Sequence, residues 1–377
     1  MLHYDNNVEQ CGFYQVGQQR YYSKLQAIMA AENCNDFPHF IFHDEEYGQH
    51  NWLQEPSESL EQLYARRAWE LRNQYDYLVL HYSSGQDSNA VLDTFIRNKI
   101  PLDEIFIRGL ISPTDKNINN NDASNMFAES YFNAYPIAQY VKDTYYPNLK
   151  ITVVDTTEYV VDFFKSNPNW CTVDTFTNTD VGVAHKSDYD ALNPAYRKMS
   201  EAGLRVGHIL GIDKPVMVYE NGEYHIKFLD KLLNIFFPTR NTTIDVPLYS
   251  EPFFWAKSTA PLIIKQAHAV KNYFKSNNLD PNILHRAKDR RMHDMIGNVI
   301  YPPRLMPILF NPEKQFDPSV VRPWERFFFK DPNADHVKNW NAGIASVDRI
   351  IPEKWKNKGS LFSDLVGIYS RSYSVGS

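Results

Sequence analysis

Cysteine is scarce in this sequence, and the few cysteines present lie far apart. There are three, at positions 11, 34 and 171, and no two of them form a CxxC pair. An odd number at such long spacings does not make a disulfide framework, and structural zinc sites need closely spaced Cys or His ligands. We therefore expect neither disulfides nor zinc, which fits a protein of the reducing cytoplasm.

Long hydrophobic runs are also lacking. No apolar stretch approaches the roughly 18 residues that a membrane-spanning helix needs. The first seven residues, MLHYDNN, do not begin a secretory signal, because no basic stretch is followed by an apolar core. We expect a cytoplasmic protein that does not engage a membrane.

An excess of basic residues is missing too. The formal net charge is −6 and the sequence pI is about 6.1, so broad binding to a nucleic-acid backbone is not supported. A short basic cluster at 285–291 is interrupted by Asp289 and is typical of a solvated helix face. The 24 Tyr and 23 Phe fit either an aromatic-rich core or, less simply, a base-stacking surface.

The chain is long enough, at 377 residues, for one large core or two moderate ones. No internal repeat or low-complexity tract divides it. Shifts in pattern predict an N-terminal extension over 1–56, a nucleotide-binding domain over 57–240, and a helical and irregular C-terminal region over 241–377.

One stretch has the pattern of a βαβ unit. Residues 75–82 have a continuous apolar centre, as in a strand buried on both faces of a parallel sheet. A helix with apolar residues at 91, 92, 95 and 96 follows the loop 83–88, and 103–107 is the next strand. We expect further helices at 59–73 (with a Ser59–Gln62 capping box), 123–143, 157–166, 193–202, 258–277 and 279–295, strands at 150–154 and 206–211, and a hairpin at 216–228. This order predicts an α/β fold with a doubly wound, mainly parallel sheet.

The loop of this unit, Ser83-Ser84-Gly85-Gln86-Asp87-Ser88, has the chemistry of an anion site. A helix N-terminus offers free N–H groups and partial positive charge, glycine lets the backbone turn close to a phosphate, and serines add hydroxyl donors. Asp87 fits as a helix cap or as a ligand that holds Mg²⁺ against phosphates. An ordinary strand-to-helix loop capped by Ser and Asp would also explain these residues. The loop is not a Walker A motif, since GxxxxGK[ST] is absent.

These six residues resemble the SGGxDS signature of the PP-loop superfamily, the N-type ATP pyrophosphatases or adenine nucleotide alpha hydrolase-like proteins. The departure is at the second position, where Ser84 replaces the usual first Gly. The resemblance covers residues 75–110 well, extends loosely to 230 and is absent beyond. It points to the PAPS reductase-like or asparagine synthetase-like branch, and the aromatic-rich flanks are similar to those of phage-encoded PP-loop proteins, which would act in the host cytoplasm.

The resemblance implies an enzyme that uses ATP and Mg²⁺. In such enzymes a substrate oxygen attacks the α-phosphate, pyrophosphate leaves, and a nucleophile, usually an amine, then displaces AMP. Carried over, the phosphates would contact the loop residues Ser83, Ser84, Gly85, Gln86 and Ser88. Asp87 would act in catalysis and bind the metal. The adenine would lie against the end of the next strand, at Ile107 and Arg108.

A second cluster, residues 205–215, contains Gly207, His208, Asp213 and Lys214. Related enzymes carry a later glycine-and-charge motif that faces the loop. By that resemblance Gly207 would lie near the cofactor and Asp213 would bind Mg²⁺. Lys214 would neutralise the leaving pyrophosphate, and His208 would accept a proton. A strand that ends in a turn, with His208 in the core and Lys214 solvated, explains the same residues.

Within the superfamily, further absences narrow the function. PAPS reductases need a cysteine near the C-terminus, and none follows position 171; glutamine-dependent relatives begin Met-Cys, and this chain begins Met-Leu. What remains is an ATP-dependent ligase or transferase acting on a small-molecule or nucleotide substrate. A nucleotide-binding protein without chemistry and a PAPS-binding relative are the alternatives.

Overall fold

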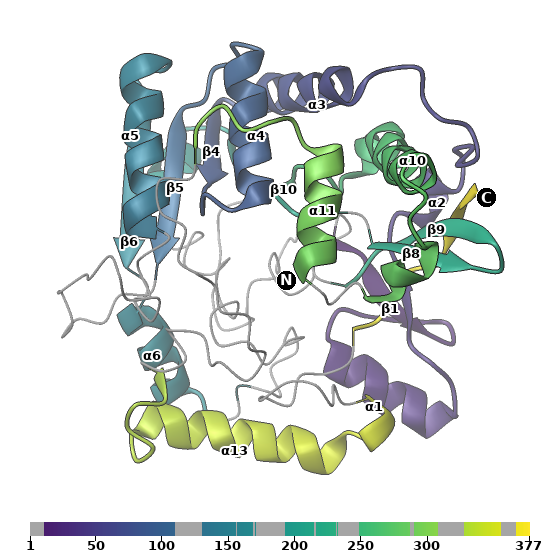
Figure 1. The fold of residues 1–377 in the computed structure, drawn as a ribbon. Coiled ribbons are helices and arrows are strands. Elements are labelled where there is room, and N and C mark those ends of the chain that lie inside the picture. The colour runs from purple at the N-terminus through teal and green to yellow at the C-terminus, as the bar shows by residue number, and fades with distance from the viewer. Residues whose placement is uncertain are drawn as a thin grey trace.

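The fold is an α/β assembly, seen here in a computed structural model (Figure 1). The structure describes residues 11–109, 130–155, 157–168, 170, 193–214, 216–230, 232, 249–286, 290–307, 328–355 and 367–377. All statements below concern this part of the chain.

A five-stranded parallel sheet lies at the centre. Its strands are β4 (Tyr77–His81), β5 (Glu104–Gly109), β6 (Lys150–Asp155), β7 (Val206–Leu210) and β10 (Tyr249–Pro252), in the spatial order β10-β7-β4-β5-β6. From β4 the chain moves outward through β5 to β6, then returns to the other side of β4 as β7 and β10. The expected doubly wound parallel sheet is therefore confirmed, and the winding reverses between β4 and β7.

The two faces of this sheet are covered by different helices. Leu78, Leu80 and Ile105 join the main core, to which α3 (Leu60–Gln74), α4 (Gln86–Arg97) and α5 (Tyr135–Thr144) also contribute. Val79 and Phe106 are the next residues along the same strands and point to the other face. They join a smaller cluster with Tyr196 of α8 (Pro194–Glu201). This alternation is the period of two expected for strands buried on both faces.

Two antiparallel sheets accompany the central one. The first, β2-β1-β3, comprises β1 (Phe13–Val16), β2 (Gln19–Tyr21) and β3 (His39–Ile41). The second, β11-β9-β8, joins the hairpin β8 (Val216–Glu220) and β9 (Glu223–Lys227) to the C-terminal strand β11 (Tyr373–Gly376). The hairpin turns at Asn221-Gly222, both with positive φ, as a two-residue turn requires.

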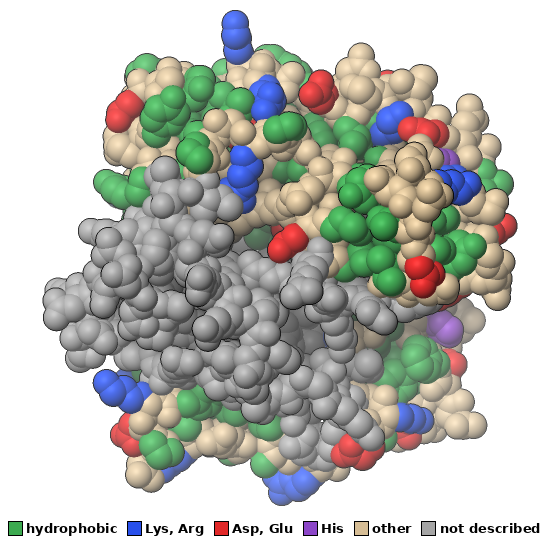
Figure 2. Space-filling model, in the orientation of Figure 1, with side chains coloured by type: hydrophobic (Ala, Val, Ile, Leu, Met, Phe, Trp, Pro, Cys, Tyr) green, Lys and Arg blue, Asp and Glu red, His purple; other side chains and the backbone are tan. Residues whose placement is uncertain are grey.

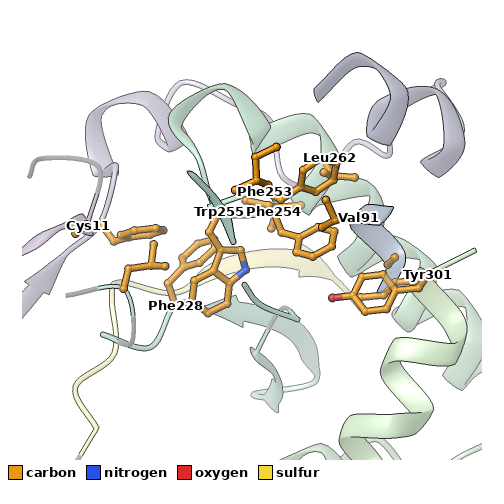
Figure 3. Packing of buried hydrophobic residues seen from close by; sticks show 14 of the residues in the cluster. Cys11, Val91, Phe228, Phe253, Phe254, Trp255, Leu262 and Tyr301 are labelled. Carbon is orange, nitrogen blue, oxygen red and sulfur yellow. The ribbon is translucent and has the colours of Figure 1, made fainter. Parts of the chain in front are cut away.

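Aromatic rings join all three sheets into one core. The Phe228 ring, just after β9, lies 5.0 Å from Phe42 and 5.4 Å from Trp255. Figure 3 shows Phe228 beside Trp255, with Phe253, Phe254 and Tyr301 continuing the cluster toward α11 (Arg290–Ile300). The segment that follows β10 therefore links the central sheet to the two smaller ones.

The remaining helices are α1 (Lys24–Cys34), α2 (Asp44–Tyr47), α6 (Thr157–Ser166), α10 (Ala260–Ser276) and α13 (Asp335–Ile350). A π-helical turn (Ser130–Ala134) precedes α5, and 3-10 turns occur at Lys257–Thr259, Pro281–Arg286 and Glu353–Trp355. α13 lies along α6 (Figure 1), where the Asn339 side chain donates to the Phe164 carbonyl at 2.9 Å.

Most of the expected elements are present, including the capping box of Ser59 and Gln62 at the start of α3. One helix, expected over 279–295, is wrong in its extent: a 3-10 turn ends at Arg286, and α11 runs from Arg290 to Ile300. Gly297 lies inside α11, where the absence of a side chain leaves room for the Gln86 side chain. The start of the helix expected over 123–143 lies outside the described residues, which resume at residue 130.

The division of the chain at residue 240 stays a prediction. β10, which begins at Tyr249, pairs with β7 in the central sheet, so that sheet takes a strand from the region 241–377. In the described ranges, none of the helices combines the length and the apolar character that crossing a bilayer requires.

Candidate functional site

The loop 83–85 lies where the winding of the sheet reverses. His81, the last residue of β4, is paired in register with Leu210, the last residue of β7. The segments that leave these two strands, 82–85 and 211–214, therefore start side by side at the carboxyl edge of the sheet. Open α/β sheets bind ligands in the crevice at such a reversal point.

The conformation of the loop differs from expectation at its glycine. Ser84 has φ 61°, in the left-handed region, whereas Gly85 has φ −60° and ψ 166°, which any residue can adopt. The residue that occupies the strained position is thus Ser84, not Gly85. Gly85 is instead the N-cap of α4, and a Cβ there would come within 3.1 Å of Ser83 Oγ.

Serine hydroxyls organise the loop internally. Ser83 Oγ accepts from the Gly85 amide at 3.3 Å and lies 3.3 Å from Ser88 Oγ, which in turn accepts from the Ser83 amide at 3.3 Å. Within the described chain, the amides of Gln86, Asp87 and Ser88 donate to no acceptor. Unpaired amides at the positive end of a helix are groups to which anions commonly bind.

Asp87 is held in a charged cluster with residues from two distant segments. Lys214 Nζ and the Tyr301 hydroxyl both donate to Asp87 Oδ1, each at 2.6 Å. The Lys214 side chain is only 3% exposed, whereas that of Asp87 is 25% exposed. Burial and the charge of Asp87 raise the pKa of Tyr301 well above its ordinary value, so Tyr301 stays a neutral donor.

The carboxylates expected to bind Mg²⁺ lie in one neighbourhood. The charges of Asp87 and Asp213 both contribute to the raised pKa of Tyr301. Asp87 Oδ1 is occupied by Lys214 and Tyr301, which leaves Oδ2 for a further ligand. Among the described side chains, no group of three or more His, Cys, Asp or Glu converges as a metal site. Asp87 and Asp213 would therefore hold Mg²⁺ only together with bound phosphates, since one or two carboxylates are the usual protein share of such a site.

Residues 301–305, here called the α11 tail, run along α4. Arg304 Nη2 donates to the Ser84 carbonyl at 3.1 Å, and the Leu305 amide donates to Asp93 Oδ2 at 3.2 Å. Burial raises the pKa of Asp93 to about 6, although the Leu305 amide and two nearby arginines oppose the shift. Sequence reasoning missed Tyr301 and Arg304, which are separated from their partners by 214 and 220 residues and carry no local motif.

Glycines permit close approach around the loop. A Cβ on Gly211 would lie 2.8 Å from the Ser88 amide nitrogen and 2.9 Å from the Asp87 carbonyl carbon, so this glycine lets the chain after β7 contact the start of α4. Gly207, expected near the cofactor, instead faces the Tyr75 ring, which its Cβ would meet at 2.5 Å. Gly207 therefore allows the Tyr75 ring to pack closely against β7.

Other expected residues lie apart from the Asp87 cluster. His208 is buried in the middle of β7, with its Nδ1 atom 3.0 Å from His81 Nε2 and its ring against Tyr196. Ile107, expected beside the adenine, is fully buried in the main core and pairs with Val153 of β6. Arg108 lies in β5, but its side chain is outside the described part of the structure.

A surface groove of about 540 Å³ lies beside the loop, between α10 and α11. It is lined by Tyr273, Asp294, Met295, Asn298 and Val299. Asn298 accepts from Gln86 Nε2 at 2.9 Å, which connects the groove to the first residue of α4. In Figure 2, hydrophobic side chains gather on this face of the molecule, around α11.

Comparisons with known proteins add little to this geometry. No family model matches the sequence, and no curated protein matches it either. Among solved structures, the chain is similar to an NH3-dependent NAD synthetase from Campylobacter jejuni subsp. jejuni NCTC 11168, in complex with the nitrate ion. The identity is 12%, the match covers 66% of this chain and 100% of that one, and the TM-score is 0.29. A likeness of that size carries no weight for function.

Proposed function

We propose that this chain binds ATP at the start of α4 and transfers its adenylyl group to a substrate oxygen. The observation that carries the proposal is the set of free amides at Gln86, Asp87 and Ser88, at the reversal point of the sheet, with the buried Lys214 ammonium beside them. Amides and an ammonium group in one place suit a polyphosphate, which carries several negative charges.

The reaction proceeds in two displacements. A substrate oxygen, such as that of a carboxylate, attacks the α-phosphorus, and the bond from that phosphorus to the bridging oxygen of the β-phosphate breaks. Pyrophosphate leaves with both electrons of that bond. Lys214, which is buried beside Asp87, would balance part of its charge. An amine then attacks the activated carbon, loses a proton to water, and AMP leaves.

Asp87 and Asp213 are the residues that would hold Mg²⁺ together with the bound phosphates. The ion would supply positive charge against the phosphate oxygens. The groove between α10 and α11 is our choice for the acceptor, since it adjoins Gln86. We place this activity in the cytoplasm, that of the host if the protein is phage-encoded.

A nucleotide-binding protein without chemistry is the second candidate. The observation that favours it is the neutralisation of Asp87 by Lys214 and Tyr301, which leaves this carboxylate less free to recruit a metal. A PAPS-binding relative would use the same amides and differ in the nucleotide it prefers.

Calorimetric titration with ATP, PAPS and pyrophosphate, each with and without Mg²⁺, tests binding. Pyrophosphate release in the presence of candidate acids and amines tests chemistry. Asp87→Asn should abolish release, whereas Asp76→Asn, which removes an exposed partner of Arg205 near the opposite end of β4, should not. Release that survives Asp87→Asn contradicts the mechanism. Tight ATP binding without turnover supports the second candidate, and a clear preference for PAPS supports the third.

A further inference from the structure

The left-handed serine in the loop needs an explanation. At φ 61° the Cβ of an L-residue crowds its own backbone, and Ser84 has neither the freedom of glycine nor the side-chain amide of asparagine. Ser84 is 5% exposed, so water does not stabilise its carbonyl group freely. Something in the surrounding structure must hold this residue in place.

Arg304 makes the contact that can do so. Its Nη2 atom donates to the Ser84 carbonyl at 3.1 Å, and a charged donor strengthens such a bond. Its Nη1 atom is buried and, in the described structure, has no acceptor. The Ser84 carbonyl is thus the partner that accounts for the position of this guanidinium.

The α11 tail is fixed well enough for Arg304 to act as a support. Tyr301 bonds to Asp87 at 2.6 Å, Leu305 bonds to Asp93 at 3.2 Å, and Arg97 Nη2 donates to the Pro303 carbonyl at 2.6 Å. The Tyr301 ring also stacks on Phe254 at 5.1 Å, inside the main core. Arg304 therefore extends from a backbone anchored at both ends of α4.

We propose that Arg304 is a positioning residue for the phosphate loop, which holds Ser84 left-handed and thereby keeps the α4 amides aligned. It compensates for the glycine that is missing at position 84. The effect on phosphate binding rests on the proposed function, but the structural coupling of Arg304 to Ser84 does not.

A double-mutant cycle with pyrophosphate as the probe tests this. Arg304→Gln should weaken pyrophosphate binding about fivefold or more, since a left-handed L-residue costs on that order. In the Ser84→Gly background, where the conformation needs no support, the same change should cost less than twofold. Arg97→Gln, which removes another contact of the tail, should have the same effect in both backgrounds.

An equal loss from Arg304→Gln in both backgrounds overturns the proposal, because it would show that the effect of Arg304 on binding does not pass through Ser84. Urea unfolding of the same four proteins provides a readout without a ligand. The midpoint should fall more on Arg304→Gln with Ser84 than with Ser84→Gly. If the unmodified protein binds no pyrophosphate or ATP, the proposed function fails. If the changes in urea midpoint within this cycle are additive, the positioning role of Arg304 fails independently of the proposed function.

Discussion

Lys214 shows how strongly a single charge can depend on its surroundings. Its ammonium group is almost fully buried, and its described contacts are the Asp87 carboxylate at 2.6 Å and the Tyr301 ring at 5.3 Å. A buried ammonium is costly unless it is paired, and Asp87 supplies that partner beside the α4 amides. Under the proposed function, Lys214 would also contact a bound phosphate.

We therefore expect Lys214→Met to weaken pyrophosphate and ATP binding about 30-fold, the order of roughly 2 kcal/mol for a desolvated charge contact. Binding of adenosine, which carries no phosphate, should change little. Titration calorimetry with the three compounds measures the contrast. Lys227→Met is the matched control, since Lys227 pairs with Glu220 on the hairpin. Equal weakening of adenosine would show that Lys214 only maintains the fold.

Asp93 is a second residue whose charge can be tested, through stability. Its folded pKa of about 6 lies above the ordinary value of 3.8, so the fold favours the protonated form. The contribution of Asp93 is fully present below about pH 4 and is lost as pH rises through about 6. Asp93→Asn should therefore stabilise the protein by about 3 kcal/mol at pH 7.5 and by little at pH 4.

Urea unfolding at the two pH values measures this difference. Asp143→Asn, on the exposed surface of α5, is the control and should leave the pH dependence unchanged. If Asp93→Asn destabilises equally at both pH values, its bonds to the Leu305 amide and to Asn89 outweigh its charge.

At the scale of elements, the sequence predicts helices, strands and turns that depend on neighbouring residues, and it misses pairings between distant segments. The apolar strand, the capping box and the Asn221-Gly222 turn act over a few residues, so β4, α3 and the β8–β9 hairpin could be placed from sequence. The pairing of β10 with β7 and of β11 with β9 depends on contacts across long separations, which no single-sequence pattern encodes. The same limit explains the site: Asp87 and Lys214 stand in recognisable clusters, whereas Tyr301 and Arg304 follow a helix in a region without motifs.

The contact between the end of β7 and the start of α4 gives a prediction for two glycines. Gly211→Ala would press a methyl group against the backbone of Asp87 and Ser88, so we expect a loss of about 1–3 kcal/mol in stability and a disproportionate loss of pyrophosphate binding. Gly207→Ala would press instead on the Tyr75 ring, at the amino side of the same strand. It should destabilise the fold but leave binding by the remaining folded protein unchanged. If both changes weaken pyrophosphate binding equally, the contact of Gly211 with the start of α4 has no special role in binding.

At the scale of the whole molecule, the three sheets share a core that passes through Phe42, Phe228 and Trp255. His43 lies at this junction, 4.2 Å from the Phe42 ring and 5.2 Å from the Tyr47 ring. Burial, reinforced by Lys257 and opposed by Glu46, lowers its pKa from 6.5 to about 4. A charge placed here acts on all three sheets, since none can separate without exposing these rings.

The acid stability of the entire chain should therefore depend on His43. Because its folded pKa lies below the unfolded value, its contribution is complete above about pH 6.5 and is lost as pH falls through about 4, a change of about 3 kcal/mol. His43→Gln, which cannot titrate, should flatten the fall in unfolding free energy between pH 6.5 and 4, whatever its constant cost in packing. His50→Gln, on the exposed surface, should keep the slope of the unmodified protein. If the three sheets form one cooperative unit, tryptophan fluorescence and far-UV circular dichroism will report the same midpoint at each pH. Separate midpoints would mean that protonation of His43 releases the small sheets and leaves the central sheet folded.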